Sequence, residues 1–281
     1  MMQPFLIREL KMSELHESLI VLYRSFNRTI PPDLKNQEKL LISLINNRIA
    51  KFLVAEEDGK IIGLGSIFIF GNVCSIGYMA VLPEVRSRGL GTDIFRNLIK
   101  IGKSKGCITF MLYASELGEP IYQKFGFRRK YATSVYSLPN KPLVLQKKDK
   151  IINHTDIFPN WAAAIDKNTI GFDRSEFLQL KINHGSILLT SDKEGFALVS
   201  GLRLGPIISK NINTAVYLMN EGINLGVNHI IVPKHSQFPR KIFKLANLTE
   251  RDSDSNLKMV YGKEVTQNLN QFYALGTYAK G

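Results

Sequence analysis

Apolar residues along positions 5–138 recur with the helical period in some segments and form strand-like runs in others. Apolar residues spaced three and four positions apart predict amphipathic helices over 12–26, 33–48 and 89–105. Apolar runs predict strands over 5–10, 52–55, 61–70, 75–81 and 107–113. A helix connects the last two strands, which are therefore expected to run parallel, while Asp58-Gly59 is typical of a hairpin between antiparallel strands. The predicted fold class is α/β (α+β), with a mixed, mostly antiparallel sheet flanked by helices.

Residues 151–281 repeat this order of elements. The pattern predicts helices over 158–165, 215–225 and 238–246, and strands over 186–189, 195–199, 203–208, 229–232 and 257–261. Between the two halves, residues 138–142 (LPNKP) and the lysine-rich residues 146–150 are typical of a linker. We therefore predict two domains, residues 1–140 and 151–281, of which the second is a degenerate copy of the first.

The segment between the strand at 75–81 and the helix at 89–105 carries the clearest chemical signal. It reads Arg86-Ser87-Arg88-Gly89-Leu90-Gly91-Thr92. A pair of glycines permits positive φ angles or a close approach of the backbone to a ligand. Backbone N–H groups at the helix start can then converge on an anion, with the positive end of the helix dipole behind them. The segment predicts a pyrophosphate cradle, although the same glycine pair is also compatible with a simple turn.

A second motif lies about thirty residues further on. Tyr122 is followed by Phe125-Gly126-Phe127, after an apolar strand and a short helix. The two motifs together resemble the Arg/Gln-x-x-Gly-x-Gly/Ala and Tyr-x-x-x-Gly-Phe segments of GNAT-type N-acetyltransferases. This resemblance covers residues 5–138 and implies that acetyl-CoA is the co-substrate, held between two central strands that diverge.

The resemblance also implies roles for individual residues. Residues of the strand would bond the pantetheine and hold the thioester carbonyl, and the cradle would bind the pyrophosphate. The cofactor-binding residues expected on this basis are Met79, Ala80, Val81, Arg86, Ser87, Arg88, Gly89, Leu90, Gly91, Thr92 and Ser115. Many family members have Asn where this chain has Ser115, so this position departs mildly from the pattern.

Tyr122 is the expected catalytic residue. When an amine attacks a thioester, the departing thiolate leaves more readily if it is protonated. A phenol has an ordinary pKa near ~10 and is protonated at neutral pH, so it can donate that proton. The alternative is a tyrosine that only packs in the core. The general base stays open among Glu56, Glu57, Glu116 and Glu119.

The second half lacks both motifs. Gly205–Lys210 stands where the glycine pair would be, and residues 243–248 replace the tyrosine motif, so coenzyme binding there is not expected. Gly171–Arg174 and Ala274–Gly276 resemble segments of bacterial GNAT proteins that carry a C-terminal companion domain. Asp173 and Arg174 could contribute to an acceptor pocket or form a structural ion pair.

Composition limits the remaining possibilities. The formal net charge of +13 suits a polyphosphate ligand, and without a dense basic stripe interleaved with aromatic residues nucleic-acid binding is unlikely. No apolar run is long enough to span a membrane, and no spacing of Cys and His predicts a metal site. Cys74 and Cys107 lie in or beside predicted strands, and we expect buried free thiols, as in a cytoplasmic protein. A monomer or a homodimer is expected.

These features predict an acyltransferase that moves an acetyl group from acetyl-CoA to a primary amine of a small molecule or peptide. Transfer would be direct, in a ternary complex, because neither cysteine lies where a covalent intermediate would form. Phe26, Asn27 and Arg28, between two predicted helices, are candidates for substrate contact. The alternative function is a non-catalytic acyl-CoA sensor.

Overall fold

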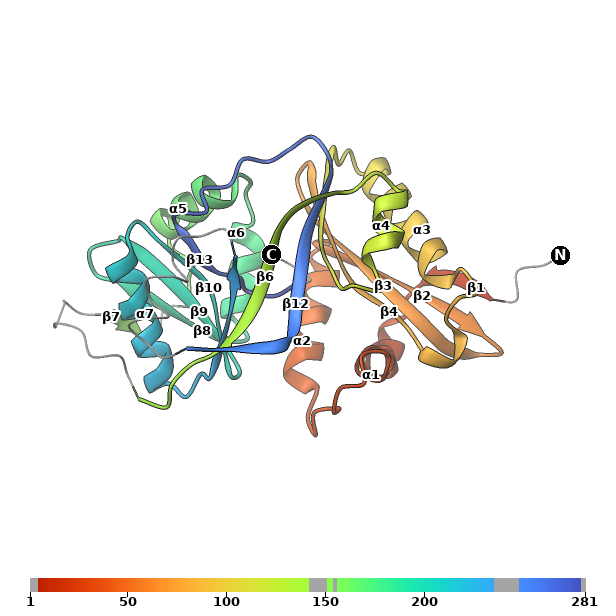
Figure 1. The fold of residues 1–281 in the computed structure, drawn as a ribbon, viewed down its shortest axis with the longest axis horizontal. Coiled ribbons are helices and arrows are strands. Elements are labelled where there is room, and N and C mark those ends of the chain that lie inside the picture. The colour runs from red at the N-terminus through yellow and green to blue at the C-terminus, as the bar shows by residue number, and fades with distance from the viewer. Residues whose placement is uncertain (1–4, 142–150, 154–155, 235–247, 279–281) are drawn as a thin grey trace.

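The computed structural model describes residues 5–141, 151–153, 156–234 and 248–278 (Figure 1). In the first half the elements run in the predicted order, and the helices begin and end close to the expected positions. They are β1 (Leu6–Glu9), α1 (Leu15–Ser25), α2 (Lys35–Asn46), β2 (Ala50–Glu57), β3 (Lys60–Phe70), β4 (Val73–Val81), α3 (Leu90–Ser104), β5 (Thr109–Ala114), α4 (Glu119–Lys124) and β6 (Arg128–Ser137).

The second half adds one helix that the apolar pattern did not predict, α6, and two short strands, β7 and β13. Its elements are β7 (Ile151–Asn153), α5 (Asn160–Ile170), α6 (Ser175–Ile182), β8 (Ser186–Thr190), β9 (Gly195–Ser200), β10 (Arg203–Ser209), α7 (Ile212–Asn224), β11 (His229–Pro233), β12 (Thr249–Gly262) and β13 (Phe272–Ala274). The helix expected at 238–246 lies outside the described residues.

All of these strands belong to one 13-stranded sheet, ordered β1-β2-β3-β4-β5-β12-β6-β11-β10-β9-β8-β7, with β13 beside β10. The only parallel pairs among the described strands are β4–β5 and β10–β11, so the sheet is mixed and mostly antiparallel, as predicted. The predicted hairpin also forms, with Glu57 opposite Lys60 and positive φ at Asp58 and Gly59.

The two halves exchange strands at the centre of the sheet. The long strand β12 lies between β5 and β6, pairing Met259 with Leu112 on one side and Leu257 with Ala132 on the other. On its other edge, β6 pairs with β11 of the second half. Figure 1 shows β12 and β6 side by side between the two groups of helices. The predicted boundary near residue 140 therefore lies beyond a strand, β6, that pairs only with strands of the second half.

Three apolar cores hold the helices on the sheet. One lies under α3, where Ile94, Phe95 and Leu98 are fully buried, and it consists of first-half residues together with Met259 of β12. Another lies under α7 and consists of second-half residues together with Tyr136 and Leu138 of the first half. The third is shared: it contains Leu19 of α1, Leu44 of α2 and residues of α5 and α6. Burial of apolar side chains is the main stabilising term in folding, so each half contributes through this shared core to the stability of the other.

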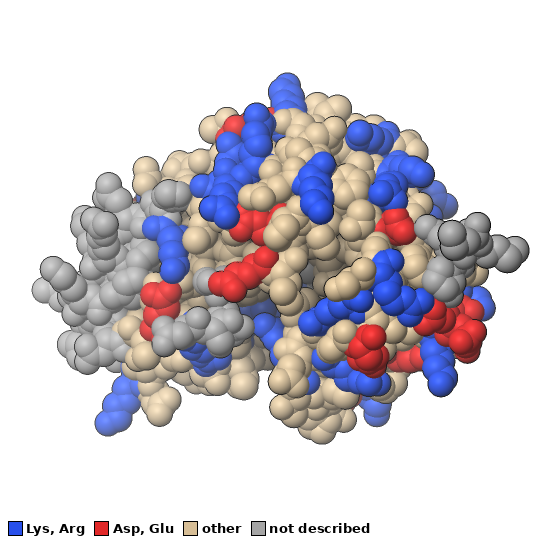
Figure 2. Space-filling view, turned by 45° about the vertical axis from the view of Figure 1, so that its right-hand side comes forward, with Lys and Arg blue, Asp and Glu red and all other residues tan. Residues whose placement is uncertain are grey.

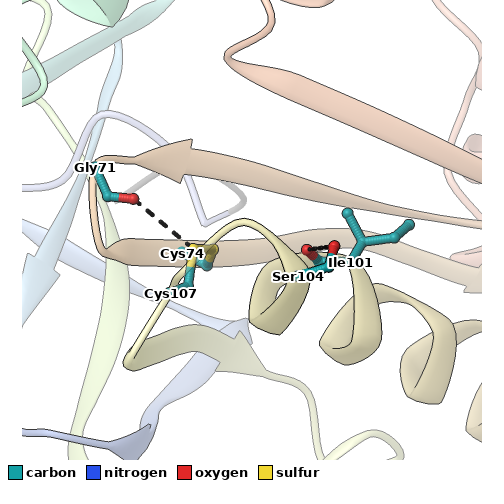
Figure 3. Close-up of a disulfide and its surroundings, with 5 residues drawn as sticks. All are labelled: Gly71, Cys74, Ile101, Ser104 and Cys107. Atoms are coloured by element: carbon teal, nitrogen blue, oxygen red, sulfur yellow. Dashed lines mark hydrogen bonds between the residues drawn. A yellow bond between two sulfur atoms is a disulfide. The ribbon is translucent and has the colours of Figure 1, made fainter.

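The expectation of free thiols is wrong. Cys74 and Cys107 form a disulfide, with their Cα atoms 6.2 Å apart (Figure 3). Cys74 is near the start of β4, and Cys107 is in the turn that leads from α3 into β5, so the sequence pattern placed both in or near strands but gave no sign that their side chains meet. The argument from free thiols to a reducing compartment therefore no longer applies. Among the described helices, none is long and apolar enough to cross a membrane.

Candidate active site

Strands β4 and β5 diverge at their carboxyl ends. They pair in parallel from Val73 opposite Thr109 to Ile76 opposite Leu112, and no further pair follows although β4 continues to Val81. At the same place the register between β3 and β4 shifts, and Tyr78 takes a positive φ of 53°. A non-glycine residue in this region is uncommon and marks a locally strained backbone. The bulge and the divergence open the sheet.

A cavity of about 270 Å³ occupies this opening. Both halves of the chain line it. From the first half come Leu22, Tyr23, Phe26, Arg28, Gln37, Ile76, Gly77, Tyr78, Met79, Leu112, Tyr113, Ser115 and Tyr122, and from the second half Arg203, Asn256, Thr277 and Tyr278. Of the three candidates for substrate contact between α1 and α2, Phe26 and Arg28 line the cavity, while Asn27 does not.

The predicted cradle forms the start of α3. Gly89 has a φ of 86°, a conformation open to glycine at little cost, and no atom lies within 4 Å of the position that a Cβ would occupy. Ser87 also has a positive φ, of 65°. The first amide groups of a helix have no partner within that helix, so those after Gly89 are available to an anion. The local geometry is that of an anion cradle.

The two arginines of this segment are engaged elsewhere. The Arg86 side chain donates to the carbonyl oxygens of Val81 and of Ser25 at the end of α1, which fixes the loop to the first helix. Arg88 forms a two-pronged ion pair with Glu57 and lowers the pKa of that carboxyl group. In this structure the positive charge at the cradle therefore comes mainly from the helix end rather than from these side chains.

Tyr122 lies on α4 with its ring in the core and its edge on the cavity. The side chain is 7% exposed, and its ring centroid lies 4.7 Å from that of Phe95. Within the described part of the chain, its hydroxyl group has no hydrogen-bond partner. Burial, the sole cause, raises the pKa of Tyr122 well above its ordinary value. The hydroxyl is therefore a protonated donor throughout the neutral range.

The other predicted cofactor-binding residues lie along the opening or beside it. Met79 lines the cavity, and Ala80 and Val81 continue β4 toward the cradle, where a Cβ on Gly91 would lie 3.7 Å from the Val81 side chain. Ser115 lines the cavity at the end of β5, and its Oγ accepts a bond from the Gly118 amide, 3.3 Å away. Leu90 is buried and Thr92 is partly buried, so only their backbone amides face a ligand readily.

The second half reaches the cavity through a strand end and a tail. Arg203 begins β10. After β13, Leu275 bridges to Ile231 of β11, and its carbonyl oxygen would lie only 2.1 Å from a Cβ on Gly205. This close passage beside Gly205 directs Thr277 and Tyr278 into the cavity. The sequence pattern gave no sign of Arg203, Asn256, Thr277 or Tyr278, although the neighbouring tail, Ala274–Gly276, is one of the segments that resemble bacterial GNAT proteins with a companion domain.

Asp173 and Arg174 are structural and do not line the cavity. Arg174 is buried and pairs with Asp166 through two bonds of 2.9 Å. Asp173 instead accepts bonds from the amide and hydroxyl groups of Ser175 at the start of α6. The structural alternative from the sequence analysis is the one found here, although the partner of Arg174 is Asp166.

None of the four carboxylates considered as a general base lines the cavity. Glu56 pairs with Arg8, Glu57 with Arg88 and Glu119 with Arg129. Glu116 is exposed. Proton removal from an acceptor therefore has no carboxylate assigned to it among the described lining residues.

The end of β10 and the start of α7 correspond to the cradle region of the first half but have a different chemistry. Asn211 caps α7 by accepting a bond of 2.9 Å from the Thr214 amide. The Glu194 carboxylate accepts bonds from the Asn211 amide group, at 2.7 Å, and from the Thr214 hydroxyl, at 3.2 Å. A negative side chain thus occupies the helix end at which the first half offers an anion site.

Two protein-family models match this chain. A model of the acetyltransferase (GNAT) family matches residues 14–127, and a model of an acetyltransferase (GNAT) domain matches residues 162–274. The chain belongs to the GNAT acetyltransferase family. It carries two GNAT domains in tandem, the first with the cradle and Tyr122, the second without them.

Individual GNAT relatives differ in how much of the chain they match. A putative acetyltransferase from Pyrococcus horikoshii has a crystal structure that aligns over 100% of this chain and 97% of its own, with a TM-score of 0.89 and 26% identity. The uncharacterized N-acetyltransferase YitH of Bacillus subtilis is 27% identical over 67% of this chain and 68% of its own length.

A third relative matches a shorter part of the chain. A putative ribosomal-protein-bS18 alanine N-acetyltransferase of Bacillus subtilis is 32% identical over 30% of this chain. The match spans 58% of that relative's length, less than two thirds. Membership in the family therefore rests on the two family models and on the shared fold.

Proposed function

We propose that this protein transfers an acetyl group from acetyl-CoA to a primary amine of a small molecule or peptide. The observation that carries the proposal is the opening between β4 and β5, which has the cradle at one end and Tyr122 with the cavity at the other. A substrate that spans a pyrophosphate and a reactive thioester requires this arrangement of an anion site and an adjoining slot.

The residues present fit coenzyme A. The amides after Gly89 would hold the pyrophosphate, and the unpaired edge of β4 at Met79–Val81 would bond the pantetheine as an added strand does. Ser115 would contact the arm from the end of β5. An N–H group of the β4 bulge would stabilise the negative oxygen that develops during transfer. The bound coenzyme supplies an activated thioester.

Tyr122 would protonate the departing sulfur. Its pKa is raised by burial, so the phenol keeps its proton at neutral pH and can donate it as negative charge develops on the sulfur. The cavity side chains beyond Tyr122 would bind the acceptor amine next to the thioester, and direct transfer in a ternary complex follows from that placement. One Bacillus subtilis relative is named as a putative ribosomal-protein-bS18 alanine N-acetyltransferase, and this name supports a primary amine as acceptor.

The first experiment is calorimetric titration with acetyl-CoA of the wild-type protein, Gly89→Trp and Gly106→Trp. Both glycines have positive φ, 86° and 79°, and open space around the Cβ position, so the two substitutions impose similar backbone strain. Gly106 follows the other end of α3, away from the cradle. We expect one micromolar site in the wild type and in Gly106→Trp, and no measurable binding in Gly89→Trp.

Two results would contradict the proposal. Absence of binding to the wild type would show that the fold has lost its coenzyme site. Equal loss in both variants would show that strain, rather than the cradle, governs binding. If binding is confirmed, release of free coenzyme A thiol with a panel of amines tests catalysis and distinguishes an enzyme from a sensor.

A further inference from the structure

The guanidinium group of Arg203 faces the cavity without a counter-ion. Its Nε atom is inaccessible to solvent and has no hydrogen-bond partner within the described residues. No ion pair of this side chain occurs there either. Burial lowers the pKa of Arg203, and the charge of Arg28 contributes in the same direction. A partly buried cation whose Nε makes no hydrogen bond costs stability, because water no longer solvates that group.

The described residues that line the cavity around Arg203 also provide no negative charge to compensate its positive charge. Among the described lining residues there are two arginines, Arg203 and Arg28, and none is Asp or Glu. Tyr23, Tyr78 and Tyr278 act electrostatically on Arg203. The pKa values of Tyr23 and Tyr78 are raised by burial, so their phenols stay neutral at pH 7 and provide no compensating charge. The described wall of the cavity therefore has a net positive charge.

We propose that the acceptor amine carries an anionic group, a carboxylate or a phosphate monoester, which binds Arg203 inside the cavity. Arg203 comes from β10 of the second half and Tyr122 from α4 of the first, so one molecule can place its anion against one half and its amine near the thioester at the other. A guanidinium binds either anion through paired, charge-assisted bonds. This inference rests on the proposed function and gives the second GNAT domain a role in choosing the acceptor.

Arg28 marks the entrance to the same site. It is exposed near the start of the α1–α2 connection, with its guanidinium 5.8 Å from the centre of the Phe26 ring. A positive group at the rim attracts anions toward the buried one, as charged clefts do for their ligands. We therefore expect Arg28 to strengthen acceptor binding at low salt and to matter less as salt screens its charge.

A stability experiment tests the site without relying on turnover. The melting temperature is measured in saturating coenzyme A, which fills the cradle, with sodium phosphate, sodium acetate or sodium chloride at equal ionic strength. The wild type is compared with Arg203→Met and with Arg251→Gln, an exposed arginine of β12 that donates to Ser137 and does not line the cavity. We expect phosphate, acetate or both to raise the melting temperature of the wild type and Arg251→Gln, because a ligand of the folded state stabilises it.

Arg203→Met is expected to show no anion effect. Without added anion this variant should melt about 2 °C or more above the wild type, because an uncompensated buried charge has been removed. A lower melting temperature together with an unchanged anion effect would show that Arg203 is structural, and would overturn the inference.

A kinetic experiment identifies the anion. Thiol release is measured for O-phosphoethanolamine against ethanolamine, and for an amino acid against its amide. We expect the charged member of one pair to have the lower KM, and Arg203→Met to raise that KM about 10- to 100-fold with little change in the KM of the neutral member. The pair that shows the difference identifies phosphate or carboxylate as the recognised group.

Failure of the inference and failure of the proposed function give different results. Acetyl-CoA turnover with equal KM values for charged and neutral amines, unaffected by Arg203→Met, would overturn the anionic acceptor and leave the acetyltransferase intact. Loss of acetyl-CoA binding in the wild type would overturn the proposed function, on which the inference rests.

Discussion

Tyr122 shows how the surroundings of one side chain prepare it for chemistry. Its ring packs against Phe95 and Phe127, which fixes its position, and the residue lines the cavity. The same burial that holds the ring raises the pKa of the hydroxyl, so that packing and acid strength have one cause.

Tyr122→Phe removes the proposed acid and little else. We expect kcat to fall about 100-fold or more, the usual effect of losing a general acid, while the dissociation constant of acetyl-CoA changes less than about twofold. In the wild type, no loss of kcat due to this tyrosine should appear below pH 10, because its folded pKa lies above that. Steady-state kinetics and calorimetry provide both values. An unchanged kcat would assign Tyr122 to packing alone.

Lys258 of β12 is a second buried group with an altered pKa. It is 4% exposed, donates to Gln267, and lies 5.2 Å from the centre of the Tyr131 ring. Burial lowers its pKa to about 7, and the positive charges of Arg174 and Lys130 act in the same direction. The folded state therefore favours the neutral amine.

The pH dependence of stability follows from this shift. Between pH 7 and about 10 the unfolded chain keeps a proton on Lys258 that the folded chain has released, so the free energy of unfolding should rise with pH by up to about 1.4 kcal/mol per unit. Urea unfolding at several pH values measures the slope. Lys258→Met should remove it, and an equal slope in that variant would refute the assignment.

Among the elements, β4 and β5 form a pair that is closed at one end and open at the other. The disulfide joins Cys74 to Cys107 beside the paired residues, and the cavity lies where the pairing has ended. The turn that leads from β3 into β4 also contacts this end, because the Gly71 carbonyl oxygen lies 3.9 Å from the Cys107 sulfur (Figure 3). The crossover helix α3 thus connects the closed end to the cradle at the open one.

Removing the disulfide should destabilise the chain without altering the site. The cysteines are 33 positions apart, and the loop-closure model gives about 3–4 kcal/mol for a loop of this length. The free energy of unfolding of Cys74→Ser/Cys107→Ser, measured in urea, should fall by that amount, with acetyl-CoA affinity unchanged. Alkylation of the unfolded wild-type protein without reductant should find no free thiol. Two alkylated cysteines would contradict the disulfide.

At the scale of the molecule, the exchange of strands makes each half depend on the other. β12 completes the sheet of the first half, and the shared core contains side chains of α1, α2, α5 and α6. Figure 2 shows acidic and basic side chains interspersed over one face of the molecule. The oligomeric state and the absence of nucleic-acid binding stay predictions.

A fragment of residues 1–140 tests the predicted domain boundary. It lacks β11 and β12, so one edge of β5 and both edges of β6 would lose their partner strands, and the shared core would be open to water. We expect the fragment to aggregate or to lack a cooperative unfolding transition, whereas the full chain unfolds in one calorimetric transition. The opposite result would be two transitions in the full chain, with the fragment unfolding cooperatively at the temperature of one of them. That result would show that the domains are independent.

The amino-acid sequence by itself determined the local elements and the segments that are predicted to form the first-half site. Helical and strand periods, the Asp58-Gly59 turn, the glycine pair before α3 and the position of Tyr122 are properties of short segments, and short-range physics governs them. The role of each predicted site residue still awaits experiment. The tertiary structure alone decided that β12 enters the first half, that Cys74 meets Cys107 and that Arg203 and Tyr278 join Tyr122 around one cavity. These contacts join residues tens to more than a hundred positions apart, and an apolar pattern specifies which face is buried, not which distant residue it is buried against.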